Sequence, residues 1–399
     1  MRKYHYFEFL LFILIILPFL SGCWDCVEIE DRGFVVGSAI DLVDKKSDGT
    51  YELMLTNQAV VPSGVGTPME SKGNQEAYMN ISATGGSLFE ITREMSSLTS
   101  QSLFFAHIKL LLLSEDVVKE PRLFENIMDV HLRDHEMRRN LRIVVVEGEA
   151  RKALNIKPEN EKIPALYIHS LMDNNYKNFG ALKTMHIGDI HEKLLSERSY
   201  VVPELHIYNN KFLQYKGAVV FRGISNEMID SLSEDETKGL EFMTEKDEGG
   251  VIEVEVEVDG QKLTVEISKI NQTIQIKDEN RENLSVEVAI NIEGDVGERF
   301  GQAENVMDTS YLKKVEEATA NRVKELAEKT IEKAQKDLKV DILGISDILY
   351  QRHYDLWNEI KDNWVRGGNS FTQSNIHVST NAVIESVGSI RKDKATESE

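Results

Sequence analysis

Cys23 is the residue whose neighbours point most directly to a covalent modification. It follows Leu20, Ser21 and Gly22, and this Leu-Ser-Gly-Cys pattern is typical of the bacterial lipoprotein signal. In that signal the cysteine sulfur receives a diacylglyceryl group, and a peptidase that tolerates only small side chains then cleaves the chain before the cysteine. The pattern therefore predicts that Cys23 is lipidated and begins the mature chain.

The segment before Cys23 has the composition of a secretory signal peptide. Arg2 and Lys3 form a short basic start, and the apolar stretch 9–20 holds twelve residues, whereas a helix needs about 20 to span a bilayer. We predict a lipoprotein signal peptide at residues 1–22 and a mature protein outside the cytoplasm, held to the membrane by two acyl chains. An uncleaved short anchor that ends in a chance cysteine is the alternative.

The other residues with suggestive spacing do not form a catalytic or metal-binding pattern. His131 and His135 have the spacing of one helix face, but no Glu follows the first His as it does in zinc peptidases. His186 and His191 are five residues apart, which is a poor spacing for one metal. The stretch 64–66 lacks the Gly-Lys-Ser/Thr of a phosphate-binding loop. We therefore predict no catalytic residues, no metal ligands and no cofactor.

The charge of the chain excludes other classes of function. Lys and Arg number 46 against 67 Asp and Glu, which gives a formal charge of -21 over 399 residues. Nucleic acid would be repelled, so we predict no nucleic-acid partner. Anionic headgroups would be repelled as well, so membrane contact is expected through the lipid and not through a basic face. Only two cysteines are present, which excludes a disulfide scaffold, and lipidation of Cys23 would block a redox pair with Cys26.

The elements that must position these residues mix strands and helices in the first half of the chain. Ser87 and Glu90 are spaced as a capping box and predict a helix whose buried face includes Leu98. The polar stretch 62–78 has no apolar period and is expected to be a long surface loop. We assign residues 23–208 to a mixed α/β region with two subdomains. Strands are expected at 33–43, 51–61, 107–113, 141–146 and 200–208, and helices from 121, at 149–155 and at 163–174.

The second half alternates strictly between apolar and acidic residues. In the segment 252–258 the valines face one way and the glutamates the other, which predicts an antiparallel sheet with one face in water. Before this segment, Ser233 and Glu236 are spaced as a capping box and predict a helix through Met243. A long helix at 308–338, a second at 345–364 and a last strand at 376–384 follow it. We assign residues 209–392 to a C-terminal α+β domain and 393–399 to a disordered tail. The predicted class is multi-domain α+β (mixed α/β), with a C-terminal antiparallel sheet packed against a long helix.

Two tryptophans on the second of these helices allow two interpretations. Trp357 and Trp364 are seven residues apart and share one helix face. They could form a platform on which a sugar stacks, but we favour burial against the sheet.

Several short motifs, in this order along the chain, resemble one known family. They resemble the spore germination lipoproteins, which are the C subunits of the nutrient germinant receptors of endospore-forming bacteria. The motifs run from residue 23 to about 390. They are Cys23-Trp24-Asp25, Glu28, Ile40-Asp41, His107-Ile108-Lys109, Arg133-Asp134-His135-Glu136-Met137-Arg138, Asp341-Ile342-Leu343-Gly344, Trp357 and Trp364.

This resemblance implies a fold, a location and partners. It implies three α/β-type domains and a non-enzymatic lipoprotein on the outer face of the spore inner (cytoplasmic) membrane. It also implies assembly with two polytopic membrane subunits into a receptor that responds to nutrients such as amino acids or sugars. Cys23 carries over as the lipidated residue. The cluster from Arg133 to Arg138 carries over as a hallmark, and we expect its charges to form salt bridges at a helix end.

Two other functions remain open from the residues alone. The first is an extracytoplasmic solute-binding lipoprotein that captures a nutrient directly, so a small-molecule ligand stays undecided. The second is an envelope hydrolase, supported only by unassigned carboxylates and histidines. The loop 62–78 is a candidate contact surface for partner subunits, because long loops often carry function.

Overall fold

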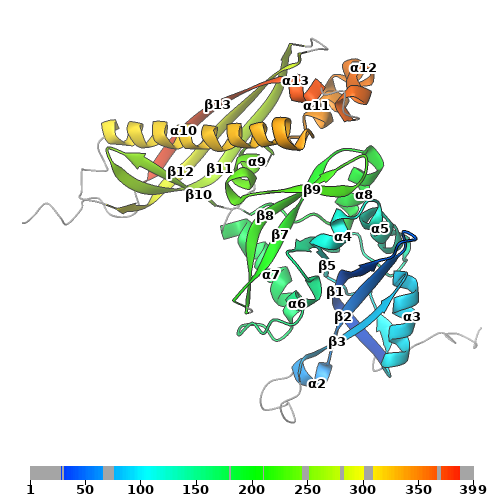
Figure 1. The fold of residues 1–399 in the computed structure, drawn as a ribbon. Helices are drawn as coiled ribbons and strands as arrows, with labels where there is room; N and C mark the ends of the chain where they lie inside the picture. Colours follow the sequence, from blue (N-terminus) through cyan, green and yellow to red (C-terminus); the bar gives the residue numbers. More distant parts are fainter. Residues whose placement is uncertain are drawn as a thin grey trace, which may run out of the picture.

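The structure is a computed structural model that shows two lobes, with the C-terminal lobe packed against one end of the N-terminal lobe (Figure 1). The predictions for residues 1–22, for Cys23 and for 393–399 lie outside the described residues. The structure describes residues 28, 31–65, 76–178, 181–209, 211–244, 251–278, 283–300, 309–365 and 370–386.

The N-terminal lobe is built on one mixed sheet. The order of its strands is β3-β2-β1-β5-β6-β7-β8-β9, and β4 lies beside the start of β1. Neighbours in the run β1, β5, β6 and β7 are parallel, and the outer pairs are antiparallel. The strands are β1 (Arg32–Lys45), β2 (Tyr51–Val60), β3 (Tyr78–Gly85), β4 (Ser102–Phe104), β5 (Leu110–Ser114), β6 (Arg142–Val146), β7 (Tyr200–Tyr208), β8 (Phe212–Arg222) and β9 (Glu227–Leu232).

Helices cover both faces of this sheet, which explains the continuous apolar runs of its central strands. Every residue of β5 is buried, as parallel strands between two helical layers require. One core lies under α3, α4, α5 and α8, and a second lies under α6 and α7. The helices are α2 (Pro62–Val65), α3 (Leu88–Leu98), α4 (Glu115–Lys119), α5 (Leu123–Arg133), α6 (Ala150–Ala153), α7 (Pro164–Asn178) and α8 (Ile187–Ser196).

The first half confirms some local predictions and corrects others. Ser87 caps α3, and its hydroxyl accepts a hydrogen bond from the N–H of Glu90 at 3.2 Å. Leu98, predicted to be buried, is 59% exposed because it lies in the last turn of the helix, beyond the edge of the core. Helix α5 begins at Leu123, after Arg122 in the left-handed region, and not at residue 121. Strand β3, helix α8 and strand β9 were not predicted.

The predicted loop at 62–78 differs from the structure at its two ends. It begins with the helical turn α2 and ends where β3 starts at Tyr78, and residues 66–75 lie outside the described residues. Its two ends touch, because the N–H of Val61 donates to the carbonyl of Ala77 at 2.8 Å. Gly64 fits between them, since a Cβ there would lie 2.2 Å from the carbonyl oxygen of Glu76.

The C-terminal lobe is a second sheet of order β10-β11-β12-β13. The alternation predicted for the first strand is confirmed, with valines buried and glutamates exposed. Strands β10 to β12 are antiparallel as predicted, but β13 runs parallel to β12. Helices lie between the two in sequence, and such a crossover returns the chain in the same direction. The strands are β10 (Ile252–Val258), β11 (Gln261–Asp278), β12 (Ser285–Phe300) and β13 (Asn375–Ser386).

The long helix α10 (Thr309–Glu332) crosses the apolar face of this sheet, as predicted (Figure 1). It continues as a π-helical segment, η3 (Lys333–Leu338). The second predicted helix is divided at His353 into α11 (Ile345–Arg352) and α12 (Tyr354–Val365), and the short α13 (Ser370–Gln373) leads into β13. The mixed α+β class with a sheet against a long helix is therefore confirmed.

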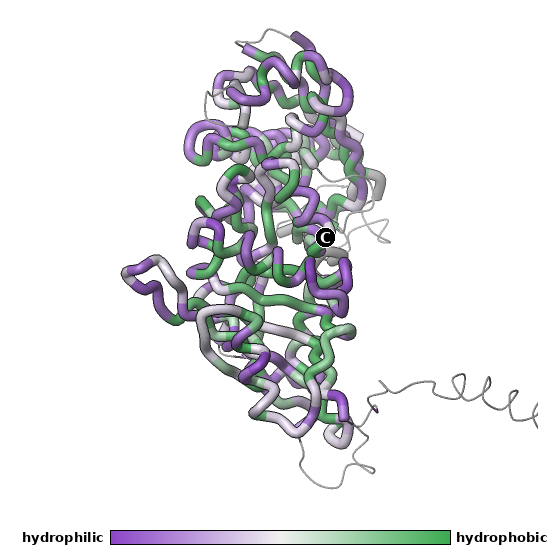
Figure 2. The backbone as a smooth tube through the Cα atoms, turned by 90° about the vertical axis from the view of Figure 1, so that its right-hand side faces the viewer, coloured by the Kyte–Doolittle hydropathy of each residue, from purple (hydrophilic) through white to green (hydrophobic). Residues whose placement is uncertain are grey.

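The two lobes share one hydrophobic core. Ala218 and Val220 of β8 and Leu232 of β9 belong to the same buried cluster as the C-terminal sheet and α10. Helix α9 (Glu234–Thr244), predicted from its Ser233 cap, fills the space between them. Hydrophobic and hydrophilic stretches alternate along the coloured part of the backbone (Figure 2), as expected for a chain folded around internal cores.

Gly239 lets α9 pack directly on the backbone of α10. A Cβ at this position would lie 2.3 Å from the carbonyl oxygen of Leu326 and 2.3 Å from the Thr330 hydroxyl. Alanine is the better helix former by about 1 kcal/mol, yet we expect Gly239→Ala to lower the free energy of unfolding by about 2 kcal/mol, because α9 must move away. Urea denaturation measures the change.

The matched control for this prediction is a second helical glycine. A Cβ at Gly188 in α8 meets the carbonyl oxygen of Arg139 at 3.3 Å, where a small shift suffices. Gly188→Ala is therefore expected to change stability by less than about 1 kcal/mol. Equal losses in the two variants would contradict close packing at Gly239.

Candidate functional site

The predicted lipid attachment precedes β1 in the sequence by nine residues. Cys23 itself is outside the described residues, and the first strand begins at Arg32. No helix in the described part of the chain is long and apolar enough to cross a membrane.

An aromatic cluster surrounds the first residues of β1. The guanidinium carbon of Arg32 lies 4.2 Å from the ring centroid of Phe104, a cation–π contact. The ring centroid of Phe34 lies 5.9 Å from that of Phe104 and 5.6 Å from that of His107. The His107-Ile108-Lys109 motif therefore lies at this end of the sheet, with Ile108 buried and the other two residues exposed.

The hallmark segment 133–138 folds back on this cluster. The Asp134 carboxylate accepts a hydrogen bond from the N–H of Glu136 at 2.8 Å, and the Glu136 carboxylate accepts one from the N–H of Phe105 at 3.1 Å. Arg133 forms the expected salt bridge at the helix end, with Asp129 at 2.7 Å. Both motif carboxylates thus hold backbone in place, which the sequence pattern did not indicate.

Two aspartates of the family motifs cap helices inside the fold. The Asp41 carboxylate accepts from the N–H groups of Ala150 at 2.6 Å and Arg151 at 3.0 Å. Burial raises its pKa, although these hydrogen bonds act in the opposite direction. The Asp341 carboxylate likewise accepts hydrogen bonds from N–H groups at the start of α11, and it also binds Trp364. Both motifs therefore fix helix positions.

Asp341 is the better satisfied of the two aspartates. Its carboxylate accepts from the N–H groups of Leu343 at 3.0 Å, Ile345 at 3.3 Å and Ser346 at 2.7 Å. It also accepts from the indole N–H of Trp364 at 3.2 Å. Trp357 and Trp364 are both buried, 7% and 6% exposed, as we favoured over a sugar platform.

A buried group of carboxylates lies at the other end of the parallel strands. Glu204 in β7 is 0% exposed, and Lys216 Nζ lies 3.3 Å from its Oε1 and 3.0 Å from Oε1 of Glu147. Glu115, at the start of α4, shares a hydrogen bond with Glu204. Burial and this neighbouring carboxylate raise the pKa of Glu204 to about 7, so Glu204 holds a proton at mildly acidic pH.

The partners of Glu204 keep their charges. Burial acts to raise the pKa of Glu115, but hydrogen bonds from Glu204 and Lys119 outweigh it and lower that pKa. Burial acts to lower the pKa of Lys216, yet Glu147 and Glu204 raise it. Sequence analysis missed this group, although a glutamate in the apolar strand 200–208 is a signal for it, because buried carboxylates need partners.

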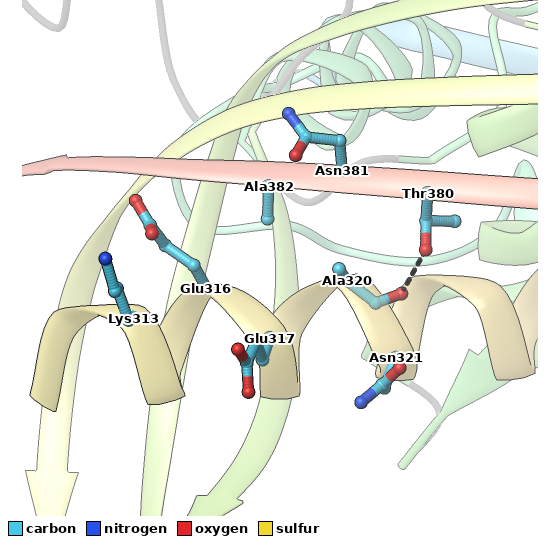
Figure 3. Close-up of a pocket in the computed structure, with 8 residues that line it drawn as sticks. All are labelled: Lys313, Glu316, Glu317, Ala320, Asn321, Thr380, Asn381 and Ala382. Carbon is cyan, nitrogen blue, oxygen red and sulfur yellow. Dashed lines mark hydrogen bonds between the residues drawn. The ribbon is translucent and has the colours of Figure 1, made fainter. Parts of the chain in front are cut away.

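An open polar groove of about 460 Å³ lies between α10 and β13 (Figure 3). The Thr380 hydroxyl donates to the carbonyl of Ala320 at 2.9 Å, and the N–H of Ile384 donates to Oε1 of Glu316 at 3.2 Å. The first bond joins a side chain of the strand to the backbone of α10, and the second joins a backbone N–H of the strand to a side chain of α10. The groove is lined by Lys313, Glu316, Glu317, Ala320, Asn321, Thr380, Asn381 and Ala382.

The histidine pairs do not form sites. His131 is buried against the carbonyl of Ile127, 2.8 Å from its Nδ1, and burial lowers its pKa, whereas His135 is exposed. The backbone N–H of His186 donates to the Asp189 carboxylate at 3.0 Å at the start of α8. Within the described ranges, no group of three or more His, Cys, Asp or Glu side chains could hold a metal ion.

The fold of the chain is shared with a solved structure. The structure "Crystal Structure of the GerBC protein" matches with a TM-score of 0.57 and 20% sequence identity, over 87% of this chain and 97% of that one. Two family sequence models match in succession. They are "Spore germination protein N-terminal domain" at residues 25–207 and "Spore germination B3/GerAC like, C-terminal" at residues 216–388.

The chain belongs to the spore germination B3/GerAC-like family, the germinant-receptor C subunits that its motifs resemble. Spore germination protein YndF of Bacillus subtilis (strain 168) is 31% identical over 396 residues, which cover 95% of this chain and 96% of that protein. Spore germination protein B3 of the same organism is 25% identical over 360 residues, with 90% and 92% covered. Spore germination protein A3 is 26% identical over 371 residues, with 92% and 95% covered.

Proposed function

We propose that the protein is a lipid-anchored, non-catalytic subunit of a nutrient germinant receptor. In this role it is attached at Cys23 to the outer face of the spore inner membrane and assembles with two polytopic membrane subunits. The observation that carries the proposal is the succession of both family matches along nearly the whole chain, directly after a lipoprotein signal that ends at Cys23. The chain then supplies an extracytoplasmic body to a membrane complex.

The interior of the protein supports a structural role over a catalytic one. The charged and polar groups of the family motifs cap helices or hold backbone, as Asp41, Asp341 and Glu136 do. The groove between α10 and β13 is polar and open, and two of the groups near it already bind each other across α10 and β13. These side chains position elements of the fold, as a subunit that works through its surfaces requires.

Replacement of the lipidated residue tests the anchor. Cys23→Ala is expected to move the protein from the membrane fraction to the soluble fraction and to impair germination, because two acyl chains supply its stable attachment. Cys26→Ala is the matched control, and it should leave the protein in the membrane fraction. Fractionation of spore membranes with a salt wash measures both. A Cys23→Ala protein that resists the salt wash would contradict lipid anchoring.

Capture of the lipidated protein from gently solubilised spore membranes tests the assembly. We expect two polytopic membrane proteins to remain bound to it. Recovery of the protein alone, together with a rise in melting temperature in the presence of amino acids or sugars, would favour direct nutrient capture, because a ligand that binds only the folded state stabilises it.

A further inference from the structure

One end of the N-terminal lobe is rich in cations, although the protein as a whole carries a charge of -21. The segment 131–142 holds four arginines and only two carboxylates. Arg138 and Arg139 are exposed and form no ion pair with the described part of the chain. Asp134 and Glu136 are directed to backbone N–H groups within the loop and at Phe105.

The register of the strands places the other cations at the same end. Arg142 is opposite Leu110, which in turn is opposite Gly37. The residues that precede these three in sequence therefore lie toward the same end of the parallel strands. The N–H of Arg142 donates to the carbonyl of Lys109, and the N–H of Lys109 donates to the carbonyl of Val36. Arg32, Lys109 and Arg139 precede Gly37, Leu110 and Arg142 in sequence, so they lie toward the same end of the sheet.

Exposed apolar side chains border these cations. Strand β4 pairs with the start of β1, with Arg32 opposite Ser102, and Leu98 ends the helix that leads into β4. Leu98 is 59% exposed, and Phe104 is half-buried beneath Arg32. Cations mixed with exposed apolar side chains suit the boundary between lipid headgroups and acyl chains.

The predicted lipid attachment, Cys23, comes shortly before β1 in the sequence. Arg32, the first residue of β1, comes nine residues after Cys23, and at about 3.6 Å per residue a chain of that length reaches at most about 32 Å. The start of β1 must then lie within that distance of the headgroups. In Figure 1, β1 to β3 and α3 lie at the bottom of the view, and the C-terminal sheet with α10 lies at the top.

We propose that this end of the lobe rests on the anionic headgroups of the bilayer that holds Cys23. We call it the basal surface, and it is formed by Arg32, Leu98, Phe104, Lys109, Arg138 and Arg139. The proposal rests on the lipid anchor of the proposed function. Each cation near an anionic membrane strengthens binding about fivefold. Ions screen charges beyond about 8 Å at physiological salt, so the acidic C-terminal lobe does not cancel this attraction.

The contact sets the orientation of the protein on the membrane. A lipid tether alone would let the lobe rotate freely, whereas a basal surface held by headgroups directs the C-terminal lobe away from the bilayer. The total charge led us to expect membrane contact only through the lipid. The proposal revises that expectation, because the cations are concentrated at one end of the protein.

A fluorescent probe at Leu98 tests the contact. The lipidated full-length chain with Cys26→Ser and Leu98→Cys carries an environment-sensitive fluorophore and is reconstituted into vesicles. The vesicles contain equal parts phosphatidylglycerol and phosphatidylcholine, or phosphatidylcholine alone. We expect blue-shifted emission and quenching by brominated lipid in the anionic vesicles only. A probe at Lys46→Cys, in the turn between β1 and β2 at the other end of the sheet, should report water in both.

Charge variants separate headgroup attraction from general stickiness. Arg138→Ala with Arg139→Ala should lower the ratio of membrane-contacting to free orientations about 25-fold, at fivefold for each cation. Arg151→Ala with Lys152→Ala removes the same charge at the opposite end of β6 and should leave the ratio unchanged. Raising the salt concentration to about 1 M, where screening acts within about 3 Å, should release the probe.

Three other results would overturn the proposal, and each identifies a different reason for its failure. A vesicle-bound protein whose Leu98 probe stays in water in both compositions rejects the basal surface and leaves the anchor intact. A probe that is protected only when the membrane subunits are present assigns the surface to a protein partner. A protein recovered unbound from both vesicles rejects the lipid anchor and this proposal together.

Discussion

Glu204→Gln is expected to make the protein more stable at pH 8 by about 3 kcal/mol and to leave its stability near pH 4.5 almost unchanged. Burial raises the pKa of Glu204 to about 7 in the folded state, above the ordinary value of 4.5. Between these two values the folded state holds a proton that the unfolded state has released. The stability supplied by the protonated group is therefore complete below pH 4.5 and is lost as the pH rises through about 7.

Glutamine reproduces the protonated form of Glu204 at every pH. Its carbonyl can still accept from Lys216, and its amide N–H can donate to Glu115 as the carboxylic acid does. Urea denaturation at several pH values between 4.5 and 8 measures the change. Glu147→Gln is the control, since Glu147 contacts the same lysine but is 48% exposed, and its loss should shift stability by less than about 1 kcal/mol. An equal loss of stability at all pH values in Glu204→Gln would mean that Glu204 is ionised in the fold.

Asp341→Ala is expected to lower the free energy of unfolding by about 4 kcal/mol. The change leaves three backbone N–H groups at the start of α11 and the indole N–H of Trp364 without their acceptor. A buried donor without a partner costs about 1–3 kcal/mol, and water can reach some of the helix N–H groups. The measurement is urea denaturation followed by tryptophan emission, to which Trp364 contributes together with Trp24 and Trp357.

Two milder variants divide this effect between the helix and the tryptophan. Trp364→Phe keeps the ring and removes one donor, so a loss of about 1–2 kcal/mol is expected. Asp341→Asn keeps one acceptor oxygen and should fall between Trp364→Phe and Asp341→Ala. If Asp341→Ala cost less than Trp364→Phe, the carboxylate would not be the group that fixes α11.

Helix α11 also joins the lobes, so its position has consequences beyond the C-terminal sheet. Asp347 in its first turn pairs with Arg198 and with Lys193, at 3.4 Å, both from the N-terminal lobe. The guanidinium carbon of Arg198 lies 4.9 Å from the ring centroid of Tyr350 on the same helix. A displaced α11 would therefore weaken the contact between the lobes as well as the packing of the C-terminal lobe.

Local patterns predicted those parts of the fold that depend on neighbouring residues. The Ser87 and Ser233 caps, the alternation in β10 and the long helix α10 each follow from side chains a few residues apart. β3 was missed because its sequence, Tyr78–Gly85, is polar and holds only two buried residues. The direction of β13 was predicted wrongly, because its buried and exposed residues alternate as in an antiparallel strand, whereas most parallel strands are buried on both faces.

The candidate sites also divide into one that contiguous residues predict and others that only the fold brings together. The lipoprotein signal at Cys23 is contiguous, so the sequence alone predicts it, and the prediction is independent of the fold. The group around Glu204 brings together residues from α4, β7, β8 and the end of β6, and the basal surface joins residues far apart in sequence. Only the register of the parallel strands brings such residues together, and one sequence does not define that register.

The parallel pairing of β13 has a consequence for the order in which the protein can fold. Its partner strand β12 ends at Phe300, 75 residues before β13 begins at Asn375. During synthesis β12 must therefore wait, with one edge open, while α10 to α13 are made. Pairings this distant in sequence form slowly, and an open edge can bind a second chain. A ribosome that stops only 25 residues early would leave the C-terminal lobe without the strand that closes its sheet.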